Sequence, residues 1–325
     1  MEKVEKFVQS YTNYFLENRI NNNKMITCSL MGGLGNQLFQ IFATISYAMK
    51  AKNEFKFLNV KTLGGNGSTL RYTFWDTFLE NLKPVLTNSF PELTLVKQEG
   101  FEYKELPISL LKNRNVCIHG YFQSYKFFEQ HFSLIYDLLD LEVRKKEVLK
   151  KIKDSFKESV CLSNCISMHF RLGDYKKFSH FHPIMPADYY IKSLKYILEN
   201  ENDNFDSKKV IYFCEEEDIQ AVEVTIRQCK KIFPPLIFIR APKVLEDWEQ
   251  MLIMSECNHH IIANSSFSWW GAYIGFANHK KQVQSIKNNQ NNSKIVCYPS
   301  LWFSPTAKEK TKDLCPDEWT KIEVN

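Results

Sequence analysis

The sequence lacks several features that mark common classes of protein. It contains no run of 18 apolar residues, so it offers no candidate transmembrane helix. No long Lys/Arg stretch interleaved with aromatics occurs and the formal net charge is only +5, which argues against nucleic acid as a partner. Residues 1–24 carry too many charged and amide side chains for a signal peptide. We therefore expect a soluble, cytoplasmic protein, peripheral to a membrane only through a lipid-linked substrate.

Metal-binding and disulfide patterns are also missing. The nine cysteines form an odd set without CxxC spacing, and most lie in apolar stretches, which predicts reduced core thiols in a reducing compartment. No Asp-x-Asp signature occurs. We expect no metal and no cofactor, so that cationic side chains and N–H groups would carry any charge stabilisation.

Length and composition favour two globular domains. The chain has 325 residues, of which 44% are hydrophobic and 24% charged, so it can bury a sizeable core. Apolar residues at helical spacing predict an N-terminal helical extension over 1–24. A charged helical tract precedes a new strand near residue 160, so we predict domains at 25–158 and 159–325.

Short β-rich apolar runs alternate with stretches of helical periodicity. In the first half we expect strands at 25–31, 54–60 and from residue 116, and a helix at 36–52. In the second half we expect five strands, namely one ending at Phe170 and the runs KVIYFC, PLIFIR, HHIIA and KIVCY, separated by helices at 187–199, 217–231, 245–256 and 267–278. This alternation predicts an α/β fold with parallel sheets, and a doubly wound nucleotide-binding domain in the second half.

The motif MHFRLGDYKK follows the first strand of the second half. His169, Arg171 and Asp174 would lie at the carboxyl edge of the sheet, where α/β proteins bind ligands. An arginine fork suits a diphosphate because its donors are fixed in a plane and stay charged. The alternative is that Arg171 and Asp174 form an ion pair that only braces the turn.

A second motif, IIANSSFSWWGAY, places Asn264, Ser265, Ser266 and Phe267 between a buried strand and a helix. Serines at a helix start leave N–H groups pointing outward, which makes an anion site. Equally, these serines can be plain caps and the aromatics plain core.

Acidic residues follow two other strands of this half. Asp247 begins a helix, where it can accept from a guanine edge or a ribose hydroxyl, or merely stabilise the helix dipole. The run from Glu215 to Asp218 can hold Mg²⁺ or form a solvated helix start.

The first half carries a glycine turn, GGLGNQLFQ, after its first strand. A dinucleotide-binding G-x-G-x-x-G counted from Gly33 requires glycine where Leu38 stands, which argues against an oxidoreductase. A later stretch, HGYFQSYKFF, sets Tyr121 and Gln123 among aromatics, a composition typical of sugar sites but also of plain core.

The motifs GGLGNQLFQ, GYFQS, HFRLGDY, NSSFSWWGA and YPSLWF, in this order, resemble the α-1,2-fucosyltransferases of glycosyltransferase family 11. The match spans about residues 25 to 303. The resemblance implies a GT-B type fold, with two facing Rossmann-like domains and a cleft between them. It also implies a metal-independent, inverting transfer of L-fucose from GDP-fucose to the 2-hydroxyl of a terminal galactose on a glycan acceptor.

The resemblance also suggests roles for residues. Arg171 would bind the β-phosphate, and His169 would sit by the nucleotide. Asp247 would contact guanine or ribose, while Ser265, Ser266 and Phe267, with Asn264 beside them, would cradle the diphosphate. Where the family usually has Ser-Asp-Asp, this chain has Cys214, Glu215 and Glu216, which puts that loop's contacts in doubt.

The glycine turn is then predicted to serve the acceptor side. Gly33 would bring backbone close to the reaction, with Asn36 and Gln37 aimed at the sugars; the alternative is that Asn36 merely caps the helix. Asp174 and His169 are candidate general bases. Other functions stay open: another GDP-sugar, a different linkage such as α-1,3, or an inactive carbohydrate-binding protein. The sequence predicts neither the acceptor glycan nor the oligomeric state.

Overall fold

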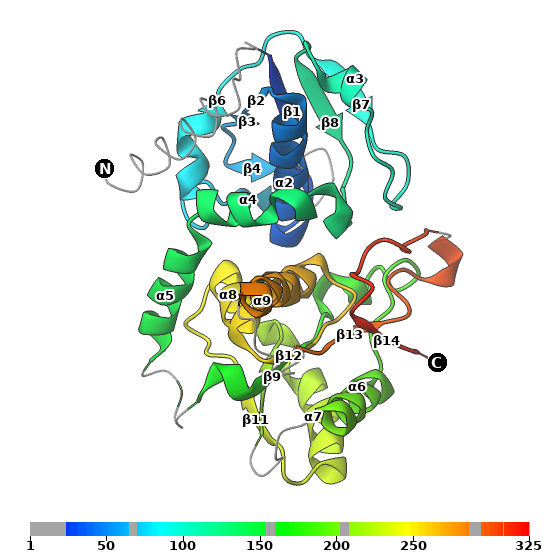
Figure 1. Cartoon of the computed structure of the whole chain (residues 1–325). Coiled ribbons are helices and arrows are strands. Elements are labelled where there is room, and N and C mark those ends of the chain that lie inside the picture. Colours follow the sequence, from blue (N-terminus) through cyan, green and yellow to red (C-terminus); the bar gives the residue numbers. More distant parts are fainter. Residues whose placement is uncertain are drawn as a thin grey trace. The chain divides into compact units, whose positions relative to one another are not determined.

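The computed structural model describes residues 24–64, 70–153, 156, 160–201, 208–285, 294–307 and 309–324. The helical extension predicted at the N-terminus lies outside these residues. The chain divides into two compact units (Figure 1): unit 1 comprises 1–144 and 310–316, and unit 2 comprises 145–309 and 317–325.

Unit 1 is built on a four-stranded sheet with the order β2-β1-β8-β7. Its strands are β1 (Met25–Cys28), β2 (Glu54–Phe55), β7 (Thr94–Lys97) and β8 (Val116–His119), and all neighbours are parallel. Helix α2 (Leu34–Ala51) connects β1 to β2 and is buried along most of its length, so it forms the centre of the unit.

The remaining elements of unit 1 are short. They are the strands β3 (Phe57–Leu58), β4 (Thr62–Leu63), β5 (Arg71–Tyr72) and β6 (Leu86–Thr87), the helices α3 (Ile108–Leu111) and α4 (Phe132–Leu138), and 3-10 turns at Glu80–Val85, Tyr125–Phe127 and Glu129–His131. The strand predicted over 54–60 is therefore wrong in extent: β2 and β3 flank Lys56 and pair with different neighbours.

Unit 2 is built on a six-stranded parallel sheet with the order β11-β10-β9-β12-β13-β14. Its strands are β9 (Cys165–His169), β10 (Lys209–Phe213), β11 (Ile237–Arg240), β12 (His259–Ile261), β13 (Val296–Pro299) and β14 (Thr320–Ile322). This is the doubly wound order, in which the direction of strand addition reverses between β9 and β12. The prediction of such a sheet is confirmed, with β14 as a strand that the sequence did not indicate.

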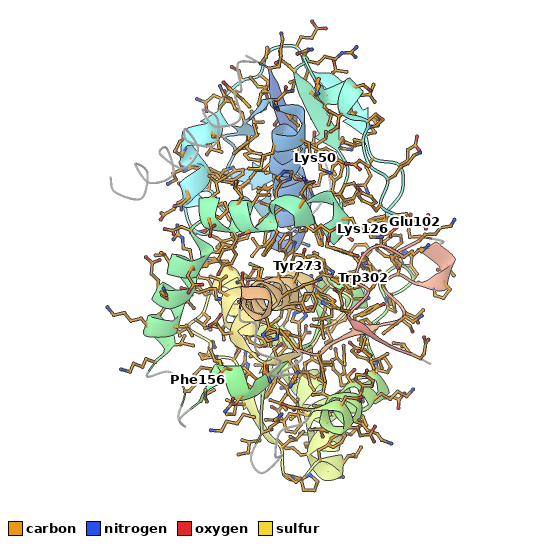
Figure 2. All side chains as sticks on the ribbon, viewed as in Figure 1. Lys50, Glu102, Lys126, Phe156, Tyr273 and Trp302 are labelled. Carbon is orange, nitrogen blue, oxygen red and sulfur yellow. The ribbon has the colours of Figure 1, made fainter. Side chains whose placement is uncertain are left out.

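Four helices cover this sheet. They are α6 (Ala187–Asn200), α7 (Ile219–Ile232), α8 (Asp247–Glu256) and α9 (Ser266–Ser285), with 3-10 turns at Leu162–Asn164, Gly173–Lys176, Glu216–Asp218 and Pro305–Ala307. Helix α8 packs on α9 while α6 contacts α7, and Figure 1 shows these pairs on opposite faces. Tyr273 of α9 (Figure 2) stacks on Trp269 with centroids 4.6 Å apart, so the aromatic motif does build core.

The boundary between the units differs from the predicted one at 158/159. Helix α5 (Leu141–Ile152) passes from one unit to the other, and Lys145 and Lys151 pair with Glu256 and Glu249 of α8 at 2.6 Å. These ion pairs attach the later part of α5 to unit 2. Two α/β units with parallel sheets are the architecture of the GT-B type, while the predicted cleft stays a prediction.

Most cysteines are buried, as predicted: Cys28, Cys165, Cys229, Cys257, Cys297 and Cys315. Cys161 is exposed, so it is not a core thiol. Among the described residues, no helix is both long and apolar enough to cross a lipid bilayer.

Candidate functional site

The carboxyl edge of the unit 2 sheet gathers the polar segments that follow β9, β10 and β12. Since β9 lies between β10 and β12, these three strand ends are neighbours, and the sheet order reverses between β9 and β12. Open α/β sheets bind ligands at this reversal because the helices that follow the two strands diverge there. The residues predicted as a donor site therefore lie at one edge.

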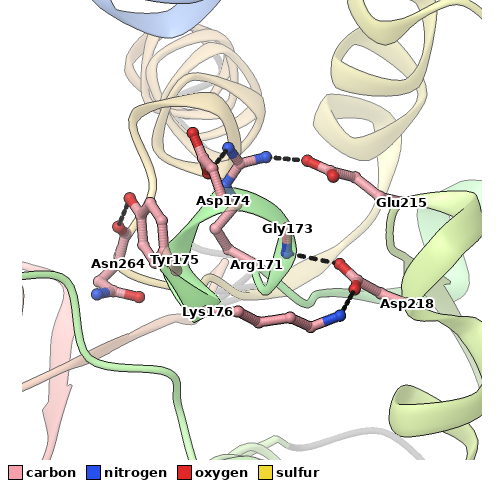
Figure 3. A network of polar contacts seen from close by, with 8 residues as sticks. All are labelled: Arg171, Gly173, Asp174, Tyr175, Lys176, Glu215, Asp218 and Asn264. Carbon is pink, nitrogen blue, oxygen red and sulfur yellow. Dashed lines mark hydrogen bonds and ion pairs between the residues drawn. The ribbon is translucent and has the colours of Figure 1, made fainter. Parts of the chain in front are cut away.

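Arg171 follows β9 and is engaged on both terminal nitrogens (Figure 3). Its Nη1 donates to Glu215 Oε1 and its Nη2 to Asp174 Oδ1, and its Cζ lies 5.2 Å from the ring centroid of Tyr175. Burial by itself would lower the pKa of Arg171, but the carboxylates of Glu215 and Asp174 raise it above its ordinary value. The guanidinium is a fixed cation, and 22% of the Arg171 side chain is exposed. The ion pair between Arg171 and Asp174, which the sequence offered as the alternative to ligand binding, is present.

Gly173 makes room for the carboxylate of Glu215. A Cβ at this position would lie 2.6 Å from Glu215 Oε2, and the backbone φ of +33° is itself disfavoured for other residues. The Gly173 N–H donates to Asp218 Oδ2 at 2.7 Å, which holds the turn in place. Burial raises the pKa of Glu215, although the charge of Arg171 opposes this.

The acidic run after β10 is used in ion pairs. Asp218 is buried and contacts Lys176 Nζ at 2.5 Å, and Glu216 pairs with Arg240 at 2.7 Å and with Lys243 at 3.2 Å. Within the described parts of the chain, no group of three or more His, Cys, Asp or Glu side chains is placed to hold a metal ion. The interpretation as a solvated helix start is confirmed for Glu215, Glu216 and Glu217, which are exposed directly before α7, whereas Asp218 is buried and braces the Gly173 turn from the inside.

His169 ends β9 and is 7% exposed, with its ring centroid 5.3 Å from that of Phe267. Its Nδ1 is buried and has no hydrogen-bond partner among the residues that the structure describes. Burial, aided by the charge of Arg171, lowers the pKa of His169 to about 3. The imidazole is therefore neutral at ordinary pH, and so weak a base is poorly matched to proton abstraction near pH 7.

The Nδ2 of Asn264 and the N–H of Ser265 are both used by backbone carbonyls. Asn264 is 1% exposed and its Nδ2 donates to the carbonyl oxygens of Pro183 at 2.9 Å and Trp302 at 3.1 Å. The Ser265 N–H donates to Ala263 O at 2.8 Å, so it is not directed at an anion as the sequence suggested.

Helix α9 begins at Ser266, and Ser266 and Phe267 are half-buried. In an α-helix the N–H groups of the first turn have no acceptor within the helix. Of the three residues predicted to cradle the anion, Ser266 and Phe267 thus keep N–H groups that can serve it, and the N–H of Ser265 does not.

Asp247 is exposed and is the first residue of α8. The capping box of this helix is made by Glu246 and Glu249, and Trp248 Nε1 also donates to Glu246 Oε2 at 2.8 Å. Asp247 takes no part in that box. It follows β11 at the same sheet edge as Arg171, a position compatible with the predicted guanine or ribose contact.

In unit 1 the structure brings together two of the residues predicted on the acceptor side. Gln123 Nε2 donates to Asn36 Oδ1 at 2.8 Å, because β1 and β8 are neighbours and both residues follow these strands. Helix α2 starts at Leu34 with Gly33 as its N-cap, so the alternative role of Asn36 as the cap is wrong. Gln123 is 7% exposed, and its Oε1 has no partner among the described residues.

Gln37 does not point toward a ligand. It is fully buried and its Nε2 donates to Gly32 O at 3.0 Å and Tyr72 O at 2.9 Å. The helical period turns its side chain inward, which corrects the prediction that it faces the sugars. Gly32 is required by its φ of +76° and by Asn36 Nδ2, which a Cβ would approach to 2.5 Å, whereas a Cβ at Gly33 would meet nothing within 4 Å.

The loop after β8 is held in an unusual conformation. Phe122 is buried with a φ of +51°, and its N–H donates to Gln98 Oε1 at 2.7 Å. Tyr121 stacks on Phe101, with centroids 5.8 Å apart and planes 10° apart. Gln98 was not predicted; its only signal was a polar residue directly after a short β-rich run.

Comparison with known proteins gives one family. The profile of Glycosyl transferase family 11 matches residues 2–302. The Alpha-1,2-colitosyltransferase of Escherichia coli is 27% identical over 92% of this chain and 99% of its own length. The Galactoside 2-alpha-L-fucosyltransferase of Caenorhabditis elegans is 24% identical over 88% of this chain and 79% of its own.

Among solved structures, a mutant of Arabidopsis thaliana FUT1 in complex with GDP aligns at 10% identity with a TM-score of 0.43, covering 85% of this chain and 76% of that chain. A likeness of this size carries no argument about the site.

Proposed function

Because the chain belongs to glycosyl transferase family 11, we propose that it transfers L-fucose from GDP-fucose to the 2-hydroxyl of a terminal galactose, with inversion and without a metal. The observation that carries the proposal is the fixed cation Arg171 at the reversal point of a doubly wound sheet, beside the start of α9. A cation and free helix N–H groups at one sheet edge suit a departing diphosphate.

The proposed donor site uses Arg171, the first-turn N–H groups of α9 at Ser266 and Phe267, and the neutral ring of His169. Negative charge develops on the diphosphate as the bond from the anomeric carbon to its oxygen breaks. Donors fixed in advance stabilise that charge without reorganising. A neutral imidazole adds a hydrogen bond without adding charge, and Asp247 would contact the guanine or the ribose.

The proposed acceptor site uses the amide pair Asn36 and Gln123 in unit 1. With Gln123 Nε2 donating to Asn36 Oδ1, the pair keeps Asn36 Nδ2 as a donor, while the acceptor Gln123 Oε1 is buried without a partner among the described residues and would have to be reached by the sugar. A sugar hydroxyl both donates and accepts, so it can bond to such a pair. Gly33, with open space at its missing Cβ, allows close approach to the backbone.

Inversion follows from one displacement, in which the acceptor oxygen forms its bond to the anomeric carbon opposite the departing GDP. The hydroxyl proton must then leave. His169, with its pKa lowered to about 3, is a poor base. Asp174 is the other residue proposed for this step, but its ion pair with Arg171 puts it on the side of the departing phosphate, so a dissociative reaction that needs a base only late fits this site better.

A second candidate donor is GDP-colitose, favoured by the name of the Escherichia coli relative at 27% identity. Colitose is L-fucose without its 3-hydroxyl, so both sugars fit the same chemistry. Competition between GDP-fucose and GDP-colitose for one acceptor would rank them. A site that hydrogen-bonds the 3-hydroxyl would reject colitose strongly, since polar groups of the protein would be left unpaired.

The test of the proposal is transfer in the presence of EDTA. The protein is incubated with GDP-fucose and a panel of β-galactosides, and the linkage of any product is determined by NMR. We expect α-1,2-linked fucose to form despite the chelator. An α-1,3 product would contradict the proposed α-1,2 linkage. Loss of activity with EDTA would contradict metal independence. Binding of the sugars without transfer or hydrolysis would indicate a carbohydrate-binding protein.

A further inference from the structure

The guanidinium of Arg171 already holds two anions. Nη1 contacts Glu215 and Nη2 contacts Asp174 (Figure 3), so both outer corners of the fork are occupied by carboxylate oxygens. A phosphate accepts from an arginine fork in the same way as a carboxylate. The guanidinium has five N–H donors in all, and a diphosphate that binds it as a fork through Nη1 and Nη2 competes with these two carboxylates.

The two carboxylates are held differently. Asp174 lies three residues after Arg171 on the same turn, so it stays close to the guanidinium at little entropic cost. Glu215 comes from the segment after β10, and 43% of its side chain is exposed. Its longer side chain has solvent to move into. Glu215 is therefore the carboxylate that can leave.

The charges around Glu215 favour its release. Arg171 attracts it, but Asp174 on the neighbouring turn and Glu217 and Asp218 on its own segment all repel it. An incoming diphosphate would add further negative charge to this group. Like charges at contact distance in a partly buried site repel strongly, so a phosphate on the fork would add to the repulsion on Glu215 and compete with it for Nη1.

The backbone beneath Glu215 forms a seat for an anionic group. The carboxylate lies over Gly173, where a Cβ would come within 2.6 Å of Oε2 and 2.9 Å of Oε1. Arg171 closes the other side of this position. The space kept open by the glycine is the space that a group bound to Nη1 occupies.

We infer that Glu215 is an internal competitor of the donor: its carboxylate occupies the position of a phosphate oxygen on Arg171 and swings toward solvent when the diphosphate binds. The inference rests on the proposed function, which places a diphosphate on Arg171. Glu215 thus lowers the affinity for the nucleotide, and with it the retention of the GDP product. It is a positioning residue that tunes donor binding and product release.

The experiment measures GDP binding by calorimetry in three variants of the full chain. Glu215→Gln removes the competing charge. Glu215→Asp keeps the charge but shortens the reach to Arg171. Glu217→Gln is the matched control, because Glu217 is an exposed carboxylate two residues away that also repels Glu215. We expect both Glu215 variants to bind GDP about fivefold more tightly than the wild type, and Glu217→Gln to change affinity less than about twofold.

Guanosine, which has no phosphate, is titrated in parallel and should bind all four proteins alike. Equal or weaker GDP binding by both Glu215 variants would overturn the inference and make Glu215 a brace for Arg171. An equal gain with guanosine would overturn it too. Failure of the wild type to bind GDP would instead overturn the proposed function, and the inference with it.

Discussion

Arg171 has two terminal nitrogens, each of which can bind a carboxylate or a phosphate. The proposed reaction requires that they bind the phosphate of the donor. Replacing it with alanine removes the cation where negative charge develops. We expect Arg171→Ala to lower kcat by about 10²-fold or more. Arg171→Lys keeps the charge without the planar fork, so its kcat should lie between those of the wild type and Arg171→Ala.

Initial rates with GDP-fucose and a β-galactoside measure this effect, and cooperative thermal unfolding shows that the variants are folded. Near-normal turnover of Arg171→Ala would mean that its ion pairs only brace the turn.

His169 provides a test of burial through pH. Its pKa is lowered from 6.5 to about 3 by burial, so between these values the unfolded chain binds a proton that the folded chain does not. As far as His169 is concerned, the free energy of unfolding is therefore at its full value above pH 6.5 and decreases as the pH falls below it. At pH 5 the loss attributable to His169 is about 2 kcal/mol. Replacing it with glutamine should remove that part of the acid sensitivity.

Chemical denaturation at pH 7 and pH 5 measures the difference. His260 is also buried with its pKa held well below the ordinary value, so the variant keeps some acid sensitivity. His180→Gln is the control, because His180 is exposed. If His169→Gln loses as much stability on acidification as the wild type, the ring is not buried in the folded protein.

The start of α2 and the loop after β8 are expected to act together in binding the acceptor. Asn36 and Gln123 share one hydrogen bond, so removing either leaves the other without its partner. We expect Asn36→Ala to lower kcat/KM for the acceptor on the order of tenfold while GDP affinity stays unchanged. The double variant Asn36→Ala/Gln123→Ala should lose little more than either single one.

Gln37→Ala is the matched control on the same helical turn. Gln37 is buried and donates to two backbone carbonyls, so its loss should cost about 1–3 kcal/mol of stability. It should not change the ratio of turnover to GDP affinity. Equal losses of both quantities in Asn36→Ala would assign the glycine turn to the nucleotide.

The sequence predicted the regular elements of unit 2 well. Helix α6 was expected at 187–199 and occupies Ala187–Asn200, because its apolar residues recur at helical spacing. The strand β14 was missed because three residues at a sheet edge leave no pattern. The split of the run at 54–60 was also missed, since continuity of β-rich residues says nothing of which neighbour each part pairs with.

The candidate site was predictable as far as strand ends determine it. His169 ends β9, Arg171 follows it, and Ser266 follows the neighbouring parallel strand β12, so topology alone brings their backbones to one edge. The direction of each side chain depends on local packing. For this reason Gln37 turned inward, Ser265 used its N–H within its own loop, and Glu215 reached Arg171, none of which the sequence indicated.

At the scale of the whole molecule, the path of the chain near its C-terminus adds a constraint on the proposed acceptor site. Residues 310–316 belong to unit 1, although the residues before and after them belong to unit 2. Asp313 pairs with Lys126 (labelled in Figure 2), and Ser124 Oγ donates to Asp313 O, contacts that span 187 and 189 positions of the sequence. Through these two contacts, segment 310–316 stabilises the loop that carries Gln123.

That loop needs fastening, because Phe122 has a φ of +51°, which costs a bulky residue on the order of 1–2 kcal/mol. Asp313→Ala removes the ion pair with Lys126. The loop is then less constrained, and Gln123 is no longer held in position to donate to Asn36. We expect kcat/KM for the acceptor to fall several-fold, on the order of a lost charge-assisted hydrogen bond, with GDP affinity unchanged. Lys310→Ala is the control in the same segment, since Lys310 only approaches the partly exposed Glu102 at 3.9 Å. Equal acceptor kinetics in the two variants would show that the ion pair of Asp313 does not position the loop.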